Sequence, residues 1–355
     1  MKEDHSRKEQ RGPLLSVIIP VFNGEAYIKQ CLESVCRQPC VDQVEILVID
    51  DGSTDDSNAI AGSVLNDQAV RYQIIKQENN GVGAARNKGI IAARGKYICF
   101  LDQDDVWVTG FFDTTVRNIL DEEFDMISFA FYQGNQNLTR VKQISQFDRV
   151  IDDPWKARGL HYRHHSSYFF KRQFILENEL FVDKYRQEDE RFRTCCLSKA
   201  RNMKCVSVPV FIYRNNAASV THRSINDMDS IYRSCLDGWR ALADKTPDEK
   251  LEKEARGIML HLLLEWFIAG CAKKNFARWY TEAFENYNGK SLYQDHGWMS
   301  KNDQENWKLL FESPKAFCKK HKPELILKKI RRKTLRISAA RKLAERYQYP
   351  IRWTV

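Results

Sequence analysis

Two hydrophobic periodicities alternate along the first third of the chain. Continuous or nearly continuous apolar runs, which predict buried strands, cover residues 14–19, 44–49 and 96–101, and a further strand is predicted over 70–76. Between them, apolar residues recur at helical spacing, most clearly over 25–37 and 84–93. Strands that alternate with helices in this way are typical of a doubly wound sheet, so we predict a Rossmann-like α/β domain with a mostly parallel central sheet.

The pattern changes after about residue 120. Further strands are predicted over 126–132, from 168 onward and over 205–213, whereas residues 133–160 are polar and irregular. From about residue 226 the apolar spacing is helical throughout. We therefore expect a disordered leader over 1–13, an α/β domain over 14–225, a smaller all-helical domain over 226–314 and a basic tail over 315–355.

The charge is placed unevenly. The net charge is +9, but residues 315–355 alone hold 14 Lys and Arg against 2 Asp and Glu, so the rest of the chain is close to neutral. Bulky apolar residues alternate with the tail's basic ones, which predicts an amphipathic helix on an anionic membrane surface. A solvated helix packed on the body is the alternative. Nucleic-acid binding is not expected, because no recognised binding motif accompanies the charge.

The cysteines and the apolar runs bear on the compartment. The ten cysteines are scattered, with neither a C-x-x-C pair nor zinc-like spacing, which favours free thiols in a reducing cytoplasm. The polar start lacks the apolar core of a signal peptide, and no window approaches the roughly 18 apolar residues of a spanning helix. We expect a cytoplasmic protein, peripheral on the inner face of the cell membrane if the tail binds lipid.

The strongest candidate chemistry follows the strand at 96–101, where Asp102, Asp104 and Asp105 stand within four positions. Carboxylates at this end of a parallel strand project to the ligand-binding edge of an open α/β sheet. Their mutual repulsion would be relieved by a divalent cation, and oxygen ligands suit Mg²⁺ or Mn²⁺. Because these ions commonly accompany phosphates, the pattern predicts a metal–diphosphate site. A solvated acidic turn that caps the next helix is the alternative.

Asp50 and Asp51 end the strand at 44–49 in the same way. A carboxylate there can accept hydrogen bonds from a base or a ribose, or it can cap a helix. Ser53 with Asp56 three residues later resembles an N-terminal capping pair, so we predict a helix from there to about residue 65.

A glycine turn follows the third strand. Gly81 and Gly83 stand in a G-x-G pattern, but Arg86 occupies the place of a third glycine, which argues against a dinucleotide fingerprint. We expect the glycines to form a turn and Arg86 to reach a nucleotide or to hold an aspartate of the site.

Two further groups of residues are weaker candidates. Glu188, Asp189 and Glu190 could supply a general base, or they could simply favour a helix start. The histidines of segment 161–165 match no standard metal-ligand spacing, so acceptor contacts are favoured somewhat over a metal site, and an ordinary polar loop is the alternative. His222 is a lone histidine in a loop and a tentative third metal ligand.

Four motifs occur together and in order. They are Val17-Ile-Ile-Pro20-Val-Phe-Asn23, Val48-Ile-Asp50-Asp51-Gly-Ser53-Thr-Asp55, Asn80-Gly81-Val-Gly83-Ala-Ala-Arg86-Asn87 and Phe100-Leu-Asp102-Gln-Asp104-Asp105. As a set they resemble the family 2 glycosyltransferases with the GT-A fold, of the bacterial surface-polysaccharide type. The resemblance is close over 14 to about 115 and looser to Thr221, and it does not cover the chain beyond about residue 226.

The resemblance implies a role for each motif on the donor side. It implies that Pro20, Val21 and Asp51 hold the uracil of a UDP-sugar, with Arg86 and Asp102 near the nucleoside. Pro20 stands where some members have Thr.

The resemblance also implies the metal ligand and the base. Asp104 would bind Mn²⁺ or Mg²⁺ on the diphosphate, and Asp189 would take the proton from the acceptor hydroxyl, with inversion at the anomeric carbon. Three acids in a row leave Glu188 or Glu190 open as the base.

The expected activity is a hexosyltransferase-type reaction. A sugar would move from a nucleotide-sugar, expected to be a UDP-sugar, to a hydroxyl of a glycan acceptor, expected to be lipid-linked, in surface polysaccharide biosynthesis. One alternative is a sugar nucleotidyltransferase, but residues 20–25 lack the basic, glycine-rich phosphate loop it would need. The other is a catalytically inactive nucleotide-sugar-binding or scaffold protein.

Overall fold

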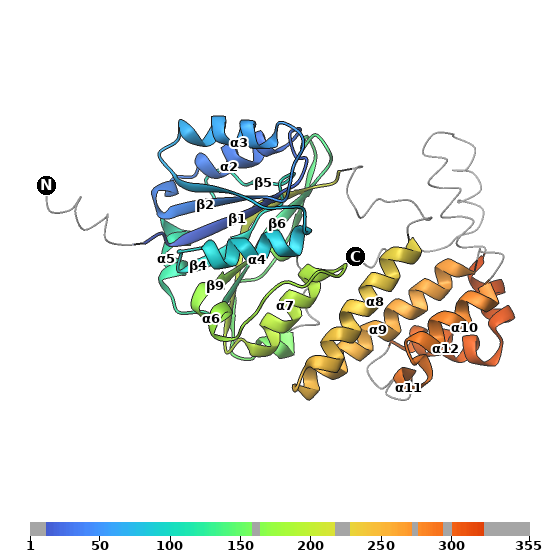
Figure 1. Ribbon diagram of the computed structural model, residues 1–355. Helices are drawn as coiled ribbons and strands as arrows, with labels where there is room; N and C mark the ends of the chain where they lie inside the picture. Colours follow the sequence, from blue (N-terminus) through green and yellow to red (C-terminus); the bar gives the residue numbers. More distant parts are fainter. Residues whose placement is uncertain (1–11, 158–163, 217–227, 272–275, 294–299, 323–355) are drawn as a thin grey trace, which may run out of the picture. The chain divides into compact units, whose positions relative to one another are not determined.

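The computed structural model describes residues 12–157, 164–216, 228–271, 276–293 and 300–322. The chain divides into two compact units, Met1–Arg223 (unit 1) and Ser224–Val355 (unit 2). Figure 1 shows a sheet covered by helices in unit 1 and a group of helices in unit 2, and each unit is described by itself.

Half of the sheet in unit 1 is parallel. Its strands are β1 (Leu15–Val21), β2 (Val44–Asp50), β3 (Arg71–Lys76) and β4 (Tyr97–Phe100), in the spatial order β3-β2-β1-β4. All three neighbouring pairs are parallel. The carboxyl ends of these strands therefore meet at one edge of the sheet, as the alternating pattern predicted.

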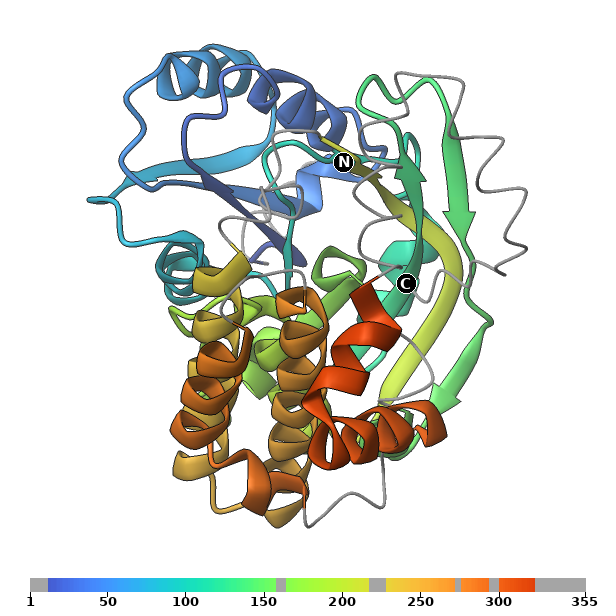
Figure 2. The same ribbon diagram turned by 90° about the vertical axis from the view of Figure 1, so that its right-hand side faces the viewer.

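The other half of the sheet is mixed. β9 (Tyr168–Lys171) runs antiparallel between β4 and β6 (Met126–Gly134), and β10 (Met203–Arg214) lies parallel to β6. β5 (Val106–Trp107) pairs antiparallel with β10. β10 is bent, as its long yellow-green arrow shows in Figure 2, and its register with β6 shifts on both sides of Pro209. Proline lacks the N–H that the ladder needs, which accounts for the irregularity.

The stretch 133–160, which was expected to be irregular, contains two short edge strands. β7 (Val141–Ile144) pairs with β6, and β8 (Arg149–Ile151) pairs with β10. Most of their residues are exposed, so neither strand carries the apolar alternation by which a half-buried strand is recognised. A 3₁₀ turn (Pro154–Ala157) follows them.

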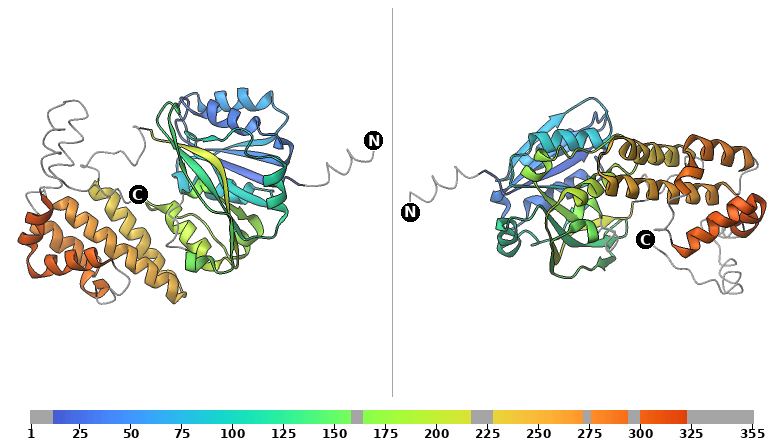
Figure 3. Two further views of the ribbon diagram at one scale, coloured as in Figure 1. Left: turned by 180° about the vertical axis from the view of Figure 1, so that it is seen from behind. Right: turned by 90° about the horizontal axis from the view of Figure 1, so that it is seen from below.

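Helices cover both faces of the sheet (Figure 3). α2 (Ile28–Cys36), α3 (Ser57–Asn66) and α5 (Thr114–Asp121) pack on one face, and α4 (Val82–Ala92), α6 (Arg172–Glu177) and α7 (Glu188–Lys199) pack on the other. β1 shows why both faces of the sheet are buried. Val17 and Ile19 pack into one hydrophobic core, and Ile18 between them packs into the other. A 3₁₀ turn (Val41–Gln43) leads into β2.

The predicted capping pair before α3 was wrong. The helix begins only at Ser57, and Oδ1 of Asp55 accepts the Ser57 N–H at 3.0 Å. The hydroxyl of Ser53 accepts the N–H of Asn23 at 3.0 Å instead. Ser53 therefore joins the loop after β2 to the loop after β1, a long-range role that local spacing could not reveal.

Unit 2 is helical in the part that the structure describes. It contains α8 (Met228–Lys245), α9 (Glu249–Gly270), α10 (Phe276–Asn286), α11 (Gly289–Tyr293) and α12 (Lys301–Glu312), followed by helical residues 314–322. Trp239, Trp266, Trp307 and Phe317 are fully or almost fully buried in its core. Phe317 lies within the stretch expected to form the basic tail, so the folded core of unit 2 extends past residue 315. Among the described helices, none has the length and apolar character needed to cross a bilayer.

Candidate functional site

The carboxyl edge of the parallel strands gathers the residues predicted for the nucleoside. Pro20 and Val21 end β1, buried and opposite Ile49 and Asp50 of β2. The N–H of Asp51 donates to the carbonyl of Val21 at 2.8 Å. The three residues predicted to hold uracil, Pro20, Val21 and Asp51, thus lie at one place on the sheet edge.

Asp51 organises the glycine turn after β3. Its Oδ1 accepts the N–H of Asn80 and the amide of Gln77, each at 2.8 Å, and its Oδ2 accepts the N–H of Gly81 at 2.8 Å. Gly81 has φ +85, a conformation that other L-residues rarely adopt. The carboxylate and the glycine together fix where α4 begins. Asp50 turns inward and accepts the N–H of Ser53 at 2.9 Å.

Arg86 is the centre of the acidic cluster. It lies on α4 with only 4% of its surface exposed. Its Nη2 lies 3.0 Å from Oδ1 of Asp102, and its Nη1 lies 2.8 Å from Oε1 of Glu188. A buried guanidinium thus joins the end of β4 to the first turn of α7, two places 86 positions apart in the chain. The described contacts thus include an aspartate of the kind that Arg86 was expected to hold.

The first turn of α7 is held in place by the loop before it. Arg191 makes two contacts of 2.6 Å with the carboxylate of Asp183 and also donates to the carbonyls of Tyr185 and Arg186. Gln187 adopts the left-handed conformation that starts the helix. The chain is thereby turned so that Glu188 and Asp189 face the cluster.

Glu190, the third acid of this run, has a different partner. Its carboxylate is bound by Arg193, three residues along the same helix. Among the three candidates for the base, Glu188 pairs with Arg86 and Asp189 approaches a histidine.

That histidine, His165, was not assigned to the site from sequence. It begins a 3₁₀ turn (His165–Ser167) directly before β9, and it is 4% exposed. Its Nε2 lies 3.4 Å from Oδ1 of Asp102 and 3.0 Å from Nη2 of Arg86, and its Nδ1 lies 3.2 Å from Oδ2 of Asp189. Only the antiparallel pairing of β9 with β4 brings it there, and no local pattern predicts that pairing.

The charges of this cluster shift one another's pKa values. Burial lowers the pKa of His165, but the Asp102 carboxylate outweighs burial and the pKa rises to about 9. Burial raises the pKa of Asp189, but the contact with Nδ1 of His165 and the charges of His165 and Arg86 bring it well below its usual range. For Asp102, the charges of His165 and Arg86 likewise overcome burial. Both carboxyl groups are therefore ionised at neutral pH.

His164 has the opposite environment. Its ring packs against Phe211 and Tyr213, with ring centroids 5.4 and 4.9 Å apart. Burial, reinforced by the charge of His165, lowers its pKa to about 3. His164 is therefore neutral at physiological pH.

Asp104 offers the donor set that a hard divalent cation prefers. Burial and the nearby charge of Asp102 raise its pKa. The described partner of its side chain is an amide, Nδ2 of Asn216, 3.4 Å from Oδ2. A carboxylate crowded by another and met only by a distant amide fits a divalent cation such as Mg²⁺ or Mn²⁺. Asp102, His164 and His165 also offer ligand atoms within 4.8 Å of one another, but the Arg86 guanidinium already lies 3.0 Å from both Oδ1 of Asp102 and Nε2 of His165.

Arg214, at the end of β10, fixes the backbone around Asp104. Its Nε donates to the carbonyl of Asp104 and its Nη1 to that of Gln136, both at 2.6 Å. Its Nη2 donates to Oε1 of Gln30 at 2.7 Å, and its N–H donates to Oδ1 of Asp105 at 2.8 Å. The short acidic loop is thus held from the far half of the sheet. His222, the tentative third ligand, and His161 lie outside the described residues.

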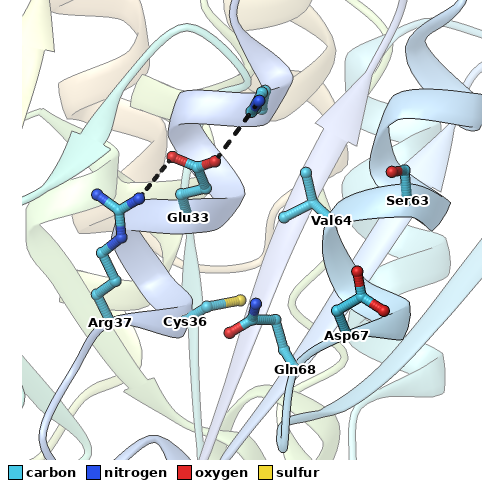
Figure 4. Close-up of a pocket in the computed structure, with 8 residues that line it drawn as sticks. Glu33, Cys36, Arg37, Ser63, Val64, Asp67 and Gln68 are labelled. Atoms are coloured by element: carbon cyan, nitrogen blue, oxygen red, sulfur yellow. Dashed lines mark hydrogen bonds and ion pairs between the residues drawn. The ribbon is translucent and has the colours of Figure 1, made fainter.

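A hollow of about 240 Å³ lies elsewhere on unit 1, between α2 and α3. Figure 4 shows Glu33 beside Arg37 in this hollow, with Cys36 and Asp67 nearby. Lys29 and Arg37 both pair with Glu33 along α2, and none of the residues at the strand ends lines the hollow. We therefore place the functional site at the carboxyl edge of the sheet.

The fold and the acidic edge define an α/β domain of the GT-A type. The profile of glycosyl transferase family 2 matches residues 16–183. These residues form a family 2 glycosyltransferase domain, so the resemblance drawn from the four motifs is confirmed.

Known proteins agree with this assignment. The chain is 33% identical over 219 residues to the uncharacterized glycosyltransferase EpsJ of Bacillus subtilis (strain 168), covering 59% of this chain and 63% of that protein. It is 37% identical over 225 residues to the uncharacterized glycosyltransferase YibD of Escherichia coli (strain K12), covering 60% and 65%. The chain thus spans just under two thirds of the length of these relatives.

A solved structure resembles the fold. The crystal structure of S. aureus TarS 1–349 in complex with UDP-GlcNAc superposes with a TM-score of 0.58 and 18% sequence identity, covering 77% of this chain and 80% of that one. At that identity the likeness concerns the fold alone, and it confirms the predicted GT-A architecture with its helical C-terminal region.

Proposed function

We propose that the protein is an inverting, metal-dependent glycosyltransferase that moves a sugar from a UDP-sugar to a hydroxyl of a glycan acceptor. The observation that carries this proposal is the Arg86 cluster. Asp102 from the end of β4 and Glu188 from α7 meet on one buried guanidinium, and Asp189 stands beside them. The acid that we assign to the donor side, Asp102, lies within the residues that match family 2, and the acids that we assign to the acceptor side follow shortly after them in the chain.

On the donor side, we assign the uracil to Pro20, Val21 and Asp51, and the rest of the nucleoside to Arg86 and Asp102. The choice of UDP is supported by TarS, whose structures contain UDP-GlcNAc and UDP. Asp104 would hold Mn²⁺ or Mg²⁺. When bound, the cation supplies positive charge that offsets the charge of the departing diphosphate.

On the acceptor side, we assign the base to Asp189. As the acceptor oxygen forms its bond to the anomeric carbon, its proton passes to the Asp189 carboxylate. The bond from that carbon to the diphosphate oxygen breaks, and its electron pair leaves with UDP. Attack from the side opposite the leaving group inverts the configuration. Glu188 is the alternative base, but its ion pair with Arg86 engages it, and Glu190 is bound to Arg193.

We further propose a lipid-linked glycan acceptor at the cytoplasmic face of the membrane. The basic, amphipathic composition of residues 315–355 supports it. A role in the biosynthesis of a glycan polymer is supported by the similarity to the minor teichoic acid biosynthesis protein GgaA of Bacillus subtilis (strain 168), which is 30% identical over 211 residues.

Thermal unfolding in the presence of UDP-, GDP-, CMP- and dTDP-sugars, with and without Mn²⁺, tests the donor site. A ligand that binds only the folded state raises the unfolding midpoint by mass action. We expect a rise with a UDP-sugar that requires Mn²⁺ and is lost in Asp104→Ala. If no nucleotide-sugar raises the midpoint of well-folded wild-type protein, the proposed function is wrong.

A further inference from the structure

We propose that His165 is a positioning residue that holds Asp189 in the orientation needed for proton abstraction. The inference rests on the proposed function, because it assigns His165 a role through the proposed base. It adds a residue that lies outside the four motifs and comes from a different segment of the chain.

The contacts of His165 single it out. Its Nδ1 lies 3.2 Å from Oδ2 of Asp189, and its Nε2 lies 3.0 Å from Nη2 of Arg86 and 3.4 Å from Oδ1 of Asp102. One imidazole therefore spans the residue assigned to the nucleoside and the residue assigned to the acceptor. Glu188, the neighbour of Asp189, is held separately by Arg86 at 2.8 Å.

The imidazole is fixed from several sides. The N–H and the hydroxyl of Ser167 both donate to the carbonyl of His164, at 2.9 and 2.7 Å, and so fix the turn that carries the ring. The ring of Phe100 lies 6.3 Å away, centroid to centroid. With only 4% of its surface exposed, His165 has little freedom to choose another rotamer.

The Nδ1 atom of His165 indicates the role of this rigid ring. It is buried and makes no well-aligned hydrogen bond to any described residue, although Oδ2 of Asp189 is 3.2 Å away. A buried polar nitrogen without a bond is unfavourable, and catalytic hydrogen bonds often align only when substrate is bound. Asp189 is 35% exposed and lies in the first turn of α7, so it is the more mobile partner.

In the reaction His165 keeps its proton. Its Nδ1–H donates to Oδ2 of Asp189, which directs the second oxygen, Oδ1, to the acceptor hydroxyl. The proton removed from that hydroxyl goes to Asp189. His165 therefore acts only through the geometry of the carboxylate, and a misplacement of about 1 Å in such a group reduces the rate on the order of 10²-fold.

Two substitutions of His165 distinguish the roles of its two ring nitrogens. In His165→Asn the amide nitrogen occupies the place of Nδ1 and can still donate to Asp189, whereas in His165→Gln it reaches only the place of Nε2. The control is His261→Gln in unit 2, where Nδ1 lies 3.7 Å from Oδ2 of Asp303 in a comparable but exposed contact. UDP release is measured with Mn²⁺ and whichever of UDP-GlcNAc, UDP-glucose and UDP-galactose the wild type turns over fastest.

We expect His165→Gln to lower kcat about 10²-fold with KM and the Kd of UDP changed less than about 3-fold, since only the base loses its orientation. His165→Asn should remain within about 5-fold of the wild type, because it restores the hydrogen bond to Asp189. Equal activity of the two variants, whether high or low, would overturn the inference.

A double variant gives a second test. If His165 works through Asp189, adding His165→Gln to Asp189→Asn should slow the reaction no further. Multiplicative losses would show that the two residues act independently and would also overturn the inference. Full activity of Asp189→Asn alone, or no UDP release by the wild type from any of the three donors, would instead refute the proposed function.

Discussion

Arg86 is a buried cation shared by two carboxylates. Its removal would break the ion pair of Glu188 and leave Asp102 beside His165. Breaking a buried ion pair on one side costs about 3–5 kcal/mol. We expect Arg86→Gln to lower the free energy of unfolding by about 3 kcal/mol, measured by urea denaturation.

The control for this prediction is Arg37→Gln. Arg37 also pairs with a glutamate at 2.9 Å, but its side chain is 72% exposed. Exposed ion pairs contribute little to stability, so Arg37→Gln should change the free energy of unfolding by less than about 1 kcal/mol. Equal effects of the two substitutions would show that Arg86 is not the buried link described here.

His164 predicts how stability changes with pH. Its folded-state pKa is lowered to about 3, whereas in the unfolded chain it should titrate near about 6.5. Between these values the unfolded state binds the extra proton, so His164 makes stability fall as the pH falls. His164→Phe keeps the aromatic packing and removes the titration. Between about pH 7.5 and about pH 5, the urea midpoint should therefore fall less in the variant than in the wild type. Identical falls would contradict the lowered pKa of His164.

At the scale of single residues, the sequence predicted those site residues whose neighbours are set by local topology. Asp51 and Asp102 follow parallel strands, and the ends of parallel strands must meet. Arg86 could be linked to the site because it follows the glycine turn beside them. His165 could not be assigned, because its position depends on an antiparallel strand that inserts beside β4 after a long excursion of the chain.

Among the elements, α4 depends on a close approach that only glycine permits. A Cβ on Gly83 would lie 2.3 Å from the carbonyl oxygen of Asp183, a backbone atom that cannot move aside cheaply. The same loop is tied to α4 by Asn87, whose amide donates to the carbonyl of Val182 at 2.7 Å. We expect Gly83→Ala to destabilise the protein by about 1–3 kcal/mol, measured by urea denaturation.

Gly62 in α3 is the matched control. A Cβ there would meet nothing within 4 Å. Alanine should therefore stabilise the helix by about 0.5–1 kcal/mol through its higher propensity. If Gly83→Ala were also stabilising, the close packing of α4 on the loop before α7 would be wrong.

The element scale also shows which parts of the fold could be predicted. The four parallel strands lie within one or two residues of their predicted positions, and the described part of unit 2 is helical, as its apolar spacing predicted. β5 has only two residues, and β7 and β8 are exposed edge strands, so none of them carries a periodic pattern. Their place is decided by the long strands with which they pair.

For the molecule as a whole, the basic tail predicts membrane association. Because Phe317 is buried in unit 2, a truncation to test this should end after Lys322 rather than at Pro314. We expect the full chain to bind phosphatidylglycerol-containing liposomes in a sedimentation assay and the chain truncated after Lys322 to bind much less. Binding should weaken as salt is added, because the attraction is electrostatic. Equal binding by both chains would place the membrane contact elsewhere.

The central claim is a glycosyl transfer in which Asp189 takes the proton. Its most direct test is UDP release from a panel of UDP-sugars with Mn²⁺, comparing the wild type with Asp189→Asn and with Lys199→Gln at the far end of the same helix. The account predicts release from at least one UDP-sugar, a fall of at least about 10²-fold in Asp189→Asn, and an unchanged rate in Lys199→Gln. Release that is absent throughout, or that is undiminished in Asp189→Asn, would contradict it.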